Sequence, residues 1–409
     1  MTSTLENDPR VQAADEGNGV RSVVTGFGRR LSRGDVGQLP VVVGLVVIAV
    51  IFQYFSDGIF LSRFNLVNLT FQMAAGGSIS VGVVLVLLLG EIDLSAGLVG
   101  GLCASIMAVL NVRYGLPAPA AVGLGLAAAM AVGALQGAWI TRFGIPSFIV
   151  TLAGLIAWQG ALLLVLGRTG TVNLRDPFIT GIAGTFFKGP AAYGFAALFI
   201  AYVAIAPLLR DRRRRAAGLT APATAVTALR AVVISALVIA VVVLLSADRG
   251  VSSALLSLVG IIIVMDFVLR RTRFGRMIYA VGGNTEAARR AGIPVKRVRT
   301  IVFVLASLFA GWGGILGASR LLAVNQSAGQ GDVLLNAIAA AVIGGTSLFG
   351  GRGSVWAALL GIMVIQSISN GMDLLSLSSS IKFMITGAVL LTTVTIDAAL
   401  RGTRGAPTR

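Results

Sequence analysis

Residues 67–90 read VNLTFQMAAGGSISVGVVLVLLLG, and EIDLSAG follows at residues 91–97 before a second apolar stretch begins. The first stretch has no charged residue and exceeds the roughly 20 residues that an α-helix needs to cross the hydrocarbon layer of a membrane. Glu91 and Asp93 interrupt the apolar character at a tight turn. The pattern therefore predicts two membrane helices that meet on one side of the bilayer.

The same pattern recurs along the chain. Apolar residues make up 56% of it and charged residues only 12%, whereas soluble domains carry about 25% charged residues. Lipid is therefore the expected solvent, and the fold class is an all-α polytopic transmembrane bundle. Some spans are short or glycine-rich enough to be re-entrant or broken. We expect about twelve spans, at residues 40–56, 67–90, 94–112, 118–140, 147–167, 190–209, 225–246, 251–269, 298–318, 333–348, 354–371 and 378–396.

The basic residues predict the orientation. With the N-terminus inside and strict alternation, most of the 33 Lys and Arg residues fall on the cytoplasmic side, as the positive-inside rule requires. Both termini are then cytoplasmic. The expected organisation is a cytoplasmic tail at 1–39, a transmembrane domain at 40–397 and a second cytoplasmic tail at 398–409.

Composition argues against several classes of function. The chain has no histidine and a single cysteine, Cys103, so a zinc or haem site is not expected. No Walker A pattern occurs, and no pattern of a hydrolytic enzyme occurs. The net charge of +17 is distributed between apolar spans, so nucleic acid is not an expected partner. We expect no bound cofactor, no metal and no catalytic residue.

The longest basic segment, residues 270–299, contains a small helix signal. Asn284 is a good N-cap after the flexible pair Gly282 and Gly283. Glu286 falls in the first turn, while Arg289 and Arg290 fall in the last turn, where each sign of charge is favoured. Gly292 ends the helix. The segment predicts a short capped helix from 285 to 291 that either docks on another protein or lies against anionic lipid.

Three motifs resemble one family. Residues 279–295 (YAVGGNTEAARRAGIPV) closely resemble the coupling segment of ribose/xylose-type ABC permeases, and residues 90–97 and 341–354 resemble two further hallmarks. The extra material near 190–246 resembles the extended xylose-type permeases. The resemblance implies a type II-like ABC importer permease with ten core spans plus an inserted pair, in the inner membrane of a bacterium.

That resemblance implies a set of partners. It predicts a second permease copy, cytoplasmic ATPase subunits that use ATP and Mg, and a periplasmic or extracellular sugar-binding protein that meets the outside loops 168–189 and 319–332. The expected substrate is a monosaccharide, D-xylose or a similar pentose. The resemblance assigns these residues to ATPase coupling: Gly282, Gly283, Asn284, Glu286, Ala287, Ala288 and Gly292.

Two further sets of residues are candidates. Glu91, Asp93 and Ser95 sit at the expected cytoplasmic turn, where they either cap the next helix or contact a partner. Polar residues within spans either line the translocation path or bond neighbouring helices; they are Gln72, Ser78, Gln136, Gln159, Asn336, Gln366 and Asn370.

Other functions are compatible with the same spans. An ion-coupled secondary carrier would need acids in mid-membrane, and Asp266 is instead explained by pairing with Arg270 four residues later. An ABC permease for branched-chain amino acids shares the layout with a different substrate. A non-transporting scaffold leaves the capped cytoplasmic helix without a role.

Overall fold

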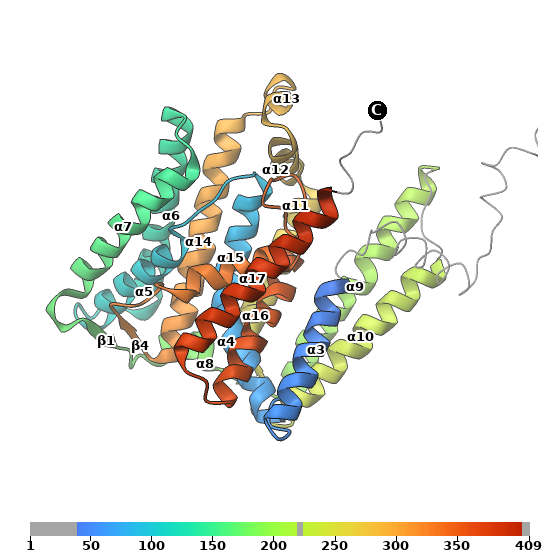
Figure 1. Ribbon diagram of the computed structural model, residues 1–409, viewed down its shortest axis with the longest axis horizontal. Helices are drawn as coiled ribbons and strands as arrows, with labels where there is room; N and C mark the ends of the chain where they lie inside the picture. Colours follow the sequence, from blue (N-terminus) through green and yellow to red (C-terminus); the bar gives the residue numbers. More distant parts are fainter. Residues whose placement is uncertain (1–38, 219–223, 403–409) are drawn as a thin grey trace, which may run out of the picture. The chain divides into compact units, whose positions relative to one another are not determined.

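A computed structural model of the chain describes residues 39–218 and 224–402. The predicted tails at 1–38 and 403–409 therefore lie outside the described residues. The chain divides into two compact units, one formed by residues 40–188 with 245 onward, the other by residues 189–244. Each is built from helices (Figure 1).

Most helices belong to the larger unit. They are α3 (Leu39–Phe55), α4 (Arg63–Leu88), α5 (Ala96–Val112), α6 (Ala118–Phe143), α7 (Ser147–Leu166), α8 (Pro177–Gly184), α11 (Ser253–Arg271), α12 (Arg273–Gly283), α13 (Thr285–Arg290), α14 (Val295–Leu321), α15 (Asp332–Ile343), α16 (Trp356–Leu374) and α17 (Ser379–Gly402). The smaller unit consists of α9 (Pro190–Ala216) and nearly all of α10 (Thr224–Ser246).

Two short antiparallel strand pairs accompany the helices. β1 (Thr171–Asn173) pairs with β4 (Ala323–Asn325), with Thr171 opposite Asn325. β2 (Phe186–Phe187) pairs with β3 (Val251–Ser252). The first pair joins the connection after α7 to the connection after α14, so the two loops predicted to lie outside are held together.

A helix lies over each of the twelve predicted ranges, which confirms the helical fold. The count of twelve spans is not confirmed. Eight helices in the described part of the chain are long and apolar enough to cross a membrane: α4, α6, α7, α9, α10, α11, α14 and α16. The apolar helices α3, α5 and α15 are shorter, and α5 and α15 each follow a non-helical connection.

Small residues set the packing of the larger unit. α14 contacts α4, α5 and α6 and lies among them in Figure 1. A Cβ on Gly82, Gly100 or Gly133 would lie only 2.5–2.7 Å from a carbonyl oxygen of α14, so these helices touch backbone to backbone. Such close packing is the usual basis of helix association in lipid.

Two glycines of α14 give a matched test of this packing. A Cβ on Gly314 would lie 2.0 Å from the Gly100 carbonyl oxygen, whereas the nearest atom to a Cβ on Gly317 is the Ala75 Cβ at 3.9 Å. We expect Gly314→Ala to destabilise the detergent-solubilised protein by about 1–3 kcal/mol, as overpacking does. Gly317→Ala should leave the melting temperature unchanged. Equal melting temperatures for both variants would contradict this account.

Candidate functional site

The segment from α12 to α13 forms a projection at one end of the larger unit (Figure 1). The N-cap residue of α12 is Thr272, whose hydroxyl accepts a hydrogen bond from the Gly275 N–H at 3.1 Å. Its buried face carries Ile278 and Val281, while Arg276 is exposed on the other side. This amphipathic pattern lays α12 along the bundle.

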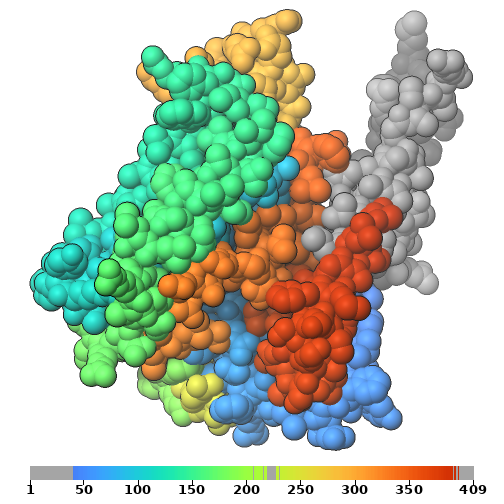
Figure 2. All heavy atoms as spheres, turned by 60° about the vertical axis from the view of Figure 1, so that its left-hand side comes forward, coloured from blue at the N-terminus to red at the C-terminus, as the bar shows by residue number. Residues whose placement is uncertain are grey.

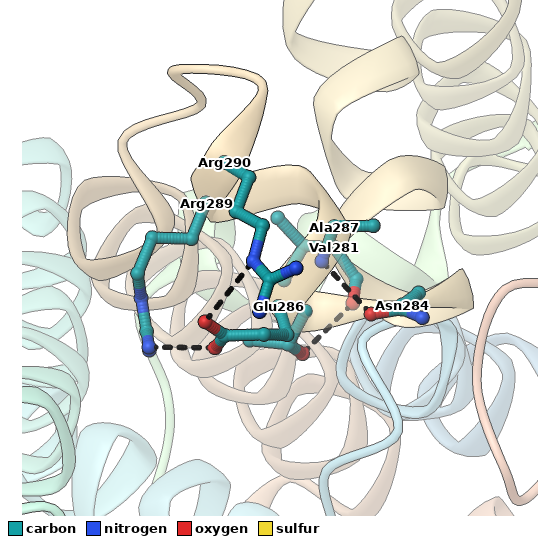
Figure 3. Close-up of polar contacts among 7 residues, drawn as sticks. Val281, Asn284, Glu286, Ala287, Arg289 and Arg290 are labelled. Carbon is teal, nitrogen blue, oxygen red and sulfur yellow. Dashed lines mark hydrogen bonds and ion pairs between the residues drawn. The ribbon is translucent and has the colours of Figure 1, made fainter.

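α13 is capped as the sequence predicts (Figure 3). Asn284 accepts a hydrogen bond from the Ala287 N–H at 2.9 Å, and the Thr285 hydroxyl donates to the Val281 carbonyl oxygen at 3.0 Å. Glu286 pairs with Arg289 at 2.8 Å and lies 3.9 Å from Arg290. All three side chains are more than half exposed, so these ion pairs add little stability.

The helix ends one residue earlier than predicted. α13 spans Thr285–Arg290, Ala291 is its C-cap residue, and Gly292 takes a φ of +79°, which glycine adopts without strain. Ala288 faces the bundle at 4% exposure, while Ala287 is exposed. On the surface of the projection, the small apolar side chain of Ala287 therefore lies between the charged side chains of α13.

The three motifs meet at one place, which we call the glycine junction: Gly90, Gly282, Gly283, Gly350 and Gly351. A Cβ on Gly282 would lie 1.8 Å from the Leu88 carbonyl oxygen, and one on Gly350 would lie 2.7 Å from the Gly282 carbonyl oxygen and 2.8 Å from the Gly90 nitrogen. The Gly351 N–H donates to the Leu88 carbonyl oxygen at 2.9 Å. Backbone thus packs on backbone from three separate segments.

Side chains hold the same segments together. Tyr279 donates from its hydroxyl to the Gly353 carbonyl oxygen at 2.9 Å. Burial raises the pKa of the Tyr279 phenol. Arg299, at the start of α14, pairs with Glu91 at 2.9 Å, with the side chains 26% and 12% exposed. The sequence did not single out either residue, although Tyr279 begins the quoted motif 279–295 and Arg299 follows it closely.

Asp93 and Ser95 lie inside the protein, with exposures of 3% and 0%. Asp93 accepts hydrogen bonds from the Ser95 N–H at 2.8 Å and the Ser95 hydroxyl at 2.7 Å. Ser95 is the N-cap residue of α5, but its side chain makes no capping bond. Gln136 donates to the Ser95 hydroxyl at 2.8 Å. The described residues offer no partner to Asp93 Oδ2 or to Gln136 Oε1.

The connection that carries Asp93 is fastened to α7. The Ile92 N–H donates to the Ser147 hydroxyl, and the Leu94 N–H donates to the Thr151 hydroxyl, both at 3.1 Å. Neither hydroxyl was a candidate from the sequence. The backbone N–H groups of a buried non-helical turn must find partners within the protein. A hydroxyl residue in an otherwise apolar helix, such as Ser147 or Thr151 in α7, was therefore the available signal.

The polar candidates for the translocation path do not form one line. Gln366 donates to Gln72 at 2.8 Å, and Asn65 donates to Asn370 at 2.8 Å, so both bonds join α4 to α16. The Ser78 hydroxyl bonds the carbonyl oxygen of Ala74 in its own helix, while Asn336 is half-buried on α15.

Gln159 is placed differently from these residues. It borders a groove of about 400 Å³ with residues from the start of α5 and the start of α15. The path role of all seven residues stays a prediction.

Metal ligands do not gather anywhere in the described part of the chain: it brings no three His, Cys, Asp or Glu side chains together as a metal site. Cys103 is a buried free thiol on α5.

Comparisons with known proteins place the chain among transport permeases. A family described as "Branched-chain amino acid transport system / permease component" matches residues 65–394. The chain is 37% identical over 362 residues to the xylose transport system permease protein XylH of Escherichia coli K12, covering 88% of this chain and 91% of the relative.

Other relatives extend the comparison. XylH of Haemophilus influenzae is 35% identical over 372 residues, covering 88% of this chain and 97% of the relative. The ribose import permease protein RbsC of Bacillus subtilis is 30% identical over 364 residues, covering 89% and 94%. No solved structure matches the chain.

The glycine junction can be tested with two adjacent residues. A Cβ on Gly282 would strike the Leu88 carbonyl oxygen, whereas a Cβ on Gly283 would meet none of the described atoms within 4 Å. We expect Gly282→Ala to lower stability by about 1–3 kcal/mol and to speed tryptic cleavage at Arg289 and Arg290, because α12 is pushed off the bundle. Gly283→Ala should match the wild type in both measurements. Unchanged cleavage in Gly282→Ala would contradict the junction.

Proposed function

The chain belongs to the family of permease components of branched-chain amino acid transport systems, and we propose that it is the membrane subunit of an ATP-driven importer of D-xylose or a similar pentose. The observation that carries this proposal is the similarity to xylose permeases over 88% of the chain at 35–37% identity. The ribose permease is also similar over nearly the whole chain, at 30%. Both relatives carry the name of a sugar.

Coupling to a separate ATPase is the proposed role of α13. The sequence has no Walker A pattern, so the energy must come from another subunit. α13 is a short capped helix whose exposed face carries Glu286, Ala287 and Arg289. Glycine permits backbone contact at the junction, so at Gly282 no side chain lies between α12 and the turns at 88–91 and 349–353. A push on α13 is therefore transmitted directly to both turns.

The sugar-binding protein is proposed to dock on the opposite side, at the predicted outside loops. β1 pairs with β4 there, the Leu174 N–H donates to the Leu322 carbonyl oxygen at 2.8 Å, and the Ala183 N–H donates to the Ser319 hydroxyl at 2.9 Å. These bonds join loops 168–189 and 319–332 into one platform. A second permease copy completes the proposed assembly.

Twelve spans with both termini in the cytoplasm remain the proposed topology. The pair α9 and α10, residues 190–246, supplies the two spans beyond a ten-span core, and it forms most of a compact unit of its own. Arg212, Arg213 and Arg214 are exposed at the end of α9, where the positive-inside rule places cytoplasmic charge. The inner membrane of a bacterium is the proposed location.

An ion-coupled carrier is the second candidate. Asp93 favours it, because a buried carboxyl with one unpartnered oxygen is the kind of group that such carriers use. The two candidates differ in what they need: an importer of the ABC type requires an ATPase subunit and a binding protein, whereas a carrier works alone.

Docking of the ATPase is tested by placing a charge on α13. We expect Ala287→Asp to weaken co-purification of the ATPase subunit by at least about tenfold, because an unpaired charge would be buried at the contact. Sugar uptake should fall in parallel. Ala216→Asp, at an exposed alanine of α9, is the matched control and should leave both measurements unchanged. Full co-purification and uptake in Ala287→Asp would contradict the coupling role.

Substrate and energy source are tested by uptake of radiolabelled D-xylose into cells lacking their own xylose permeases. We expect uptake only when an ATPase subunit and a sugar-binding protein are expressed together with the chain. Unlabelled xylose should compete more strongly than ribose, and leucine should not compete. Uptake without the ATPase would favour the carrier, and competition by leucine would favour the amino-acid permease.

A further inference from the structure

A groove on the larger unit lies where two helices begin after non-helical connections. It has a volume of about 400 Å³ and is bordered by Leu94 and Leu98 near the start of α5, Ile156 and Gln159 on α7, and Gln330 and Leu334 at the start of α15. Figure 2 looks onto this face, where α7 in green lies beside the orange segment that contains α15. Pockets that hold small molecules measure about 300–1,000 Å³, so the groove has room for one sugar ring.

Beside the groove, the two interrupted regions contact each other backbone to backbone. A Cβ on Gly97 would lie 2.5 Å from the Gly329 carbonyl oxygen, and one on Gly101 would lie 2.0 Å from the Ala328 carbonyl oxygen. Non-helical backbone in a membrane protein is tolerated where it is buried or lines a cavity. Transporters commonly build their solute sites from helices interrupted in this way.

Hydrogen-bond donors and acceptors both lie in this region. Gln159 donates to the Gln326 carbonyl oxygen at 3.4 Å, and Gln330 donates to the same oxygen at 2.8 Å. Gln159 Oε1 is buried and receives no hydrogen bond from the described residues. Each of these two side-chain amides keeps a second N–H, and the Gln159 oxygen lacks a donor, so the pair can both donate to and accept from a hydroxyl group.

The charge of the groove restricts the solute. None of the described residues that line it is charged, and its walls are leucine and isoleucine. A zwitterionic amino acid would bring two charges into these surroundings without partners, which is costly. A neutral polyol brings only hydroxyl groups and an apolar ring face. The groove thus suits a sugar and does not suit leucine or valine.

We propose that this groove is the sugar's passage through the permease, with Gln159 and Gln330 as the hydroxyl contacts. The proposal rests on the proposed sugar import. It reduces the seven polar candidates of the sequence to one, Gln159, and adds Gln330, which the sequence did not single out. Ile156, Leu98 and Leu334 form the apolar walls.

The proposal is tested by a tryptophan substitution that fills the groove, compared with a tryptophan substitution elsewhere on α7. Ile156→Trp places an indole in the groove, while Leu164→Trp places one at a position that is 83% exposed on the same helix and does not line it. We expect D-xylose uptake with the ATPase and binding protein to fall by more than roughly tenfold in Ile156→Trp. Leu164→Trp should stay within about twofold of the wild type.

A second variant separates transport from folding and from coupling. Gln159→Leu keeps the size of the side chain and removes the amide, and we expect uptake to fall roughly fivefold to tenfold. ATP hydrolysis by the reconstituted complex should still be stimulated by the loaded binding protein, because α13 is untouched. Loss of a coupling residue would instead abolish both activities.

Three results would overturn the groove as the passage, and a fourth would overturn the proposed function. Normal uptake in both Ile156→Trp and Gln159→Leu would place the path elsewhere. Equal losses in Ile156→Trp and Leu164→Trp, or a changed oligomeric state in Ile156→Trp alone, would identify the face as a contact with lipid or with a second copy. A wild type that imports no monosaccharide would overturn the proposed function itself, and the groove would then have no sugar to carry.

Discussion

Contact between backbones, without side chains in between, is the constraint on which the larger unit depends. Small residues permit it, and the chain uses glycine in this way at three places. Gly82, Gly100 and Gly133 bring α4, α5 and α6 against α14, Gly282 and Gly350 close the junction at the end of α12, and Gly97 meets the Gly329 carbonyl oxygen beside the groove. In lipid, where burial of apolar surface does not drive helices together, such van der Waals contact is a main source of association.

The same constraint explains how a six-residue helix could act on a large bundle. α13 is too short to be stable alone, and its surface ion pairs add little to it. It is fixed because Asn284 caps it, Ala288 faces the bundle, and α12 beneath it meets the turns at 88–91 and 349–353 through glycine. A contact made of backbone has no rotamers that could absorb a displacement of α12 against these turns.

The sequence predicted the helices and the capped helix α13, but it did not predict the contacts between segments that lie far apart in the chain. The apolar pattern of a helix and its capping residues can be recognised in the sequence, because both depend on residues only a few positions apart. Asn284, Glu286 and Gly292 predict the ends of α13 in this way. The pairing of Arg299 with Glu91, or of β1 with β4, joins residues that are at least 150 positions apart, so it leaves no local pattern. Asp93 illustrates the limit: its turn was visible, but its burial was not, nor were the bonds that its neighbours Ser95 and Leu94 make to Gln136 and to Thr151 of α7.

One connection runs from the glycine junction to the groove. Residues 90–94 begin at Gly90 in the glycine junction, and they end at Leu94, which borders the groove. In between, Ile92 and Leu94 are bonded to Ser147 and Thr151 of α7, the helix that also carries Gln159. Energetic coupling needs a contiguous set of contacts with two arrangements, and this connection supplies the contiguous set. A displacement of α13 that shifts Gly90 must either stretch the bonds to α7 or carry α7 with it, and in the second case the width of the groove changes.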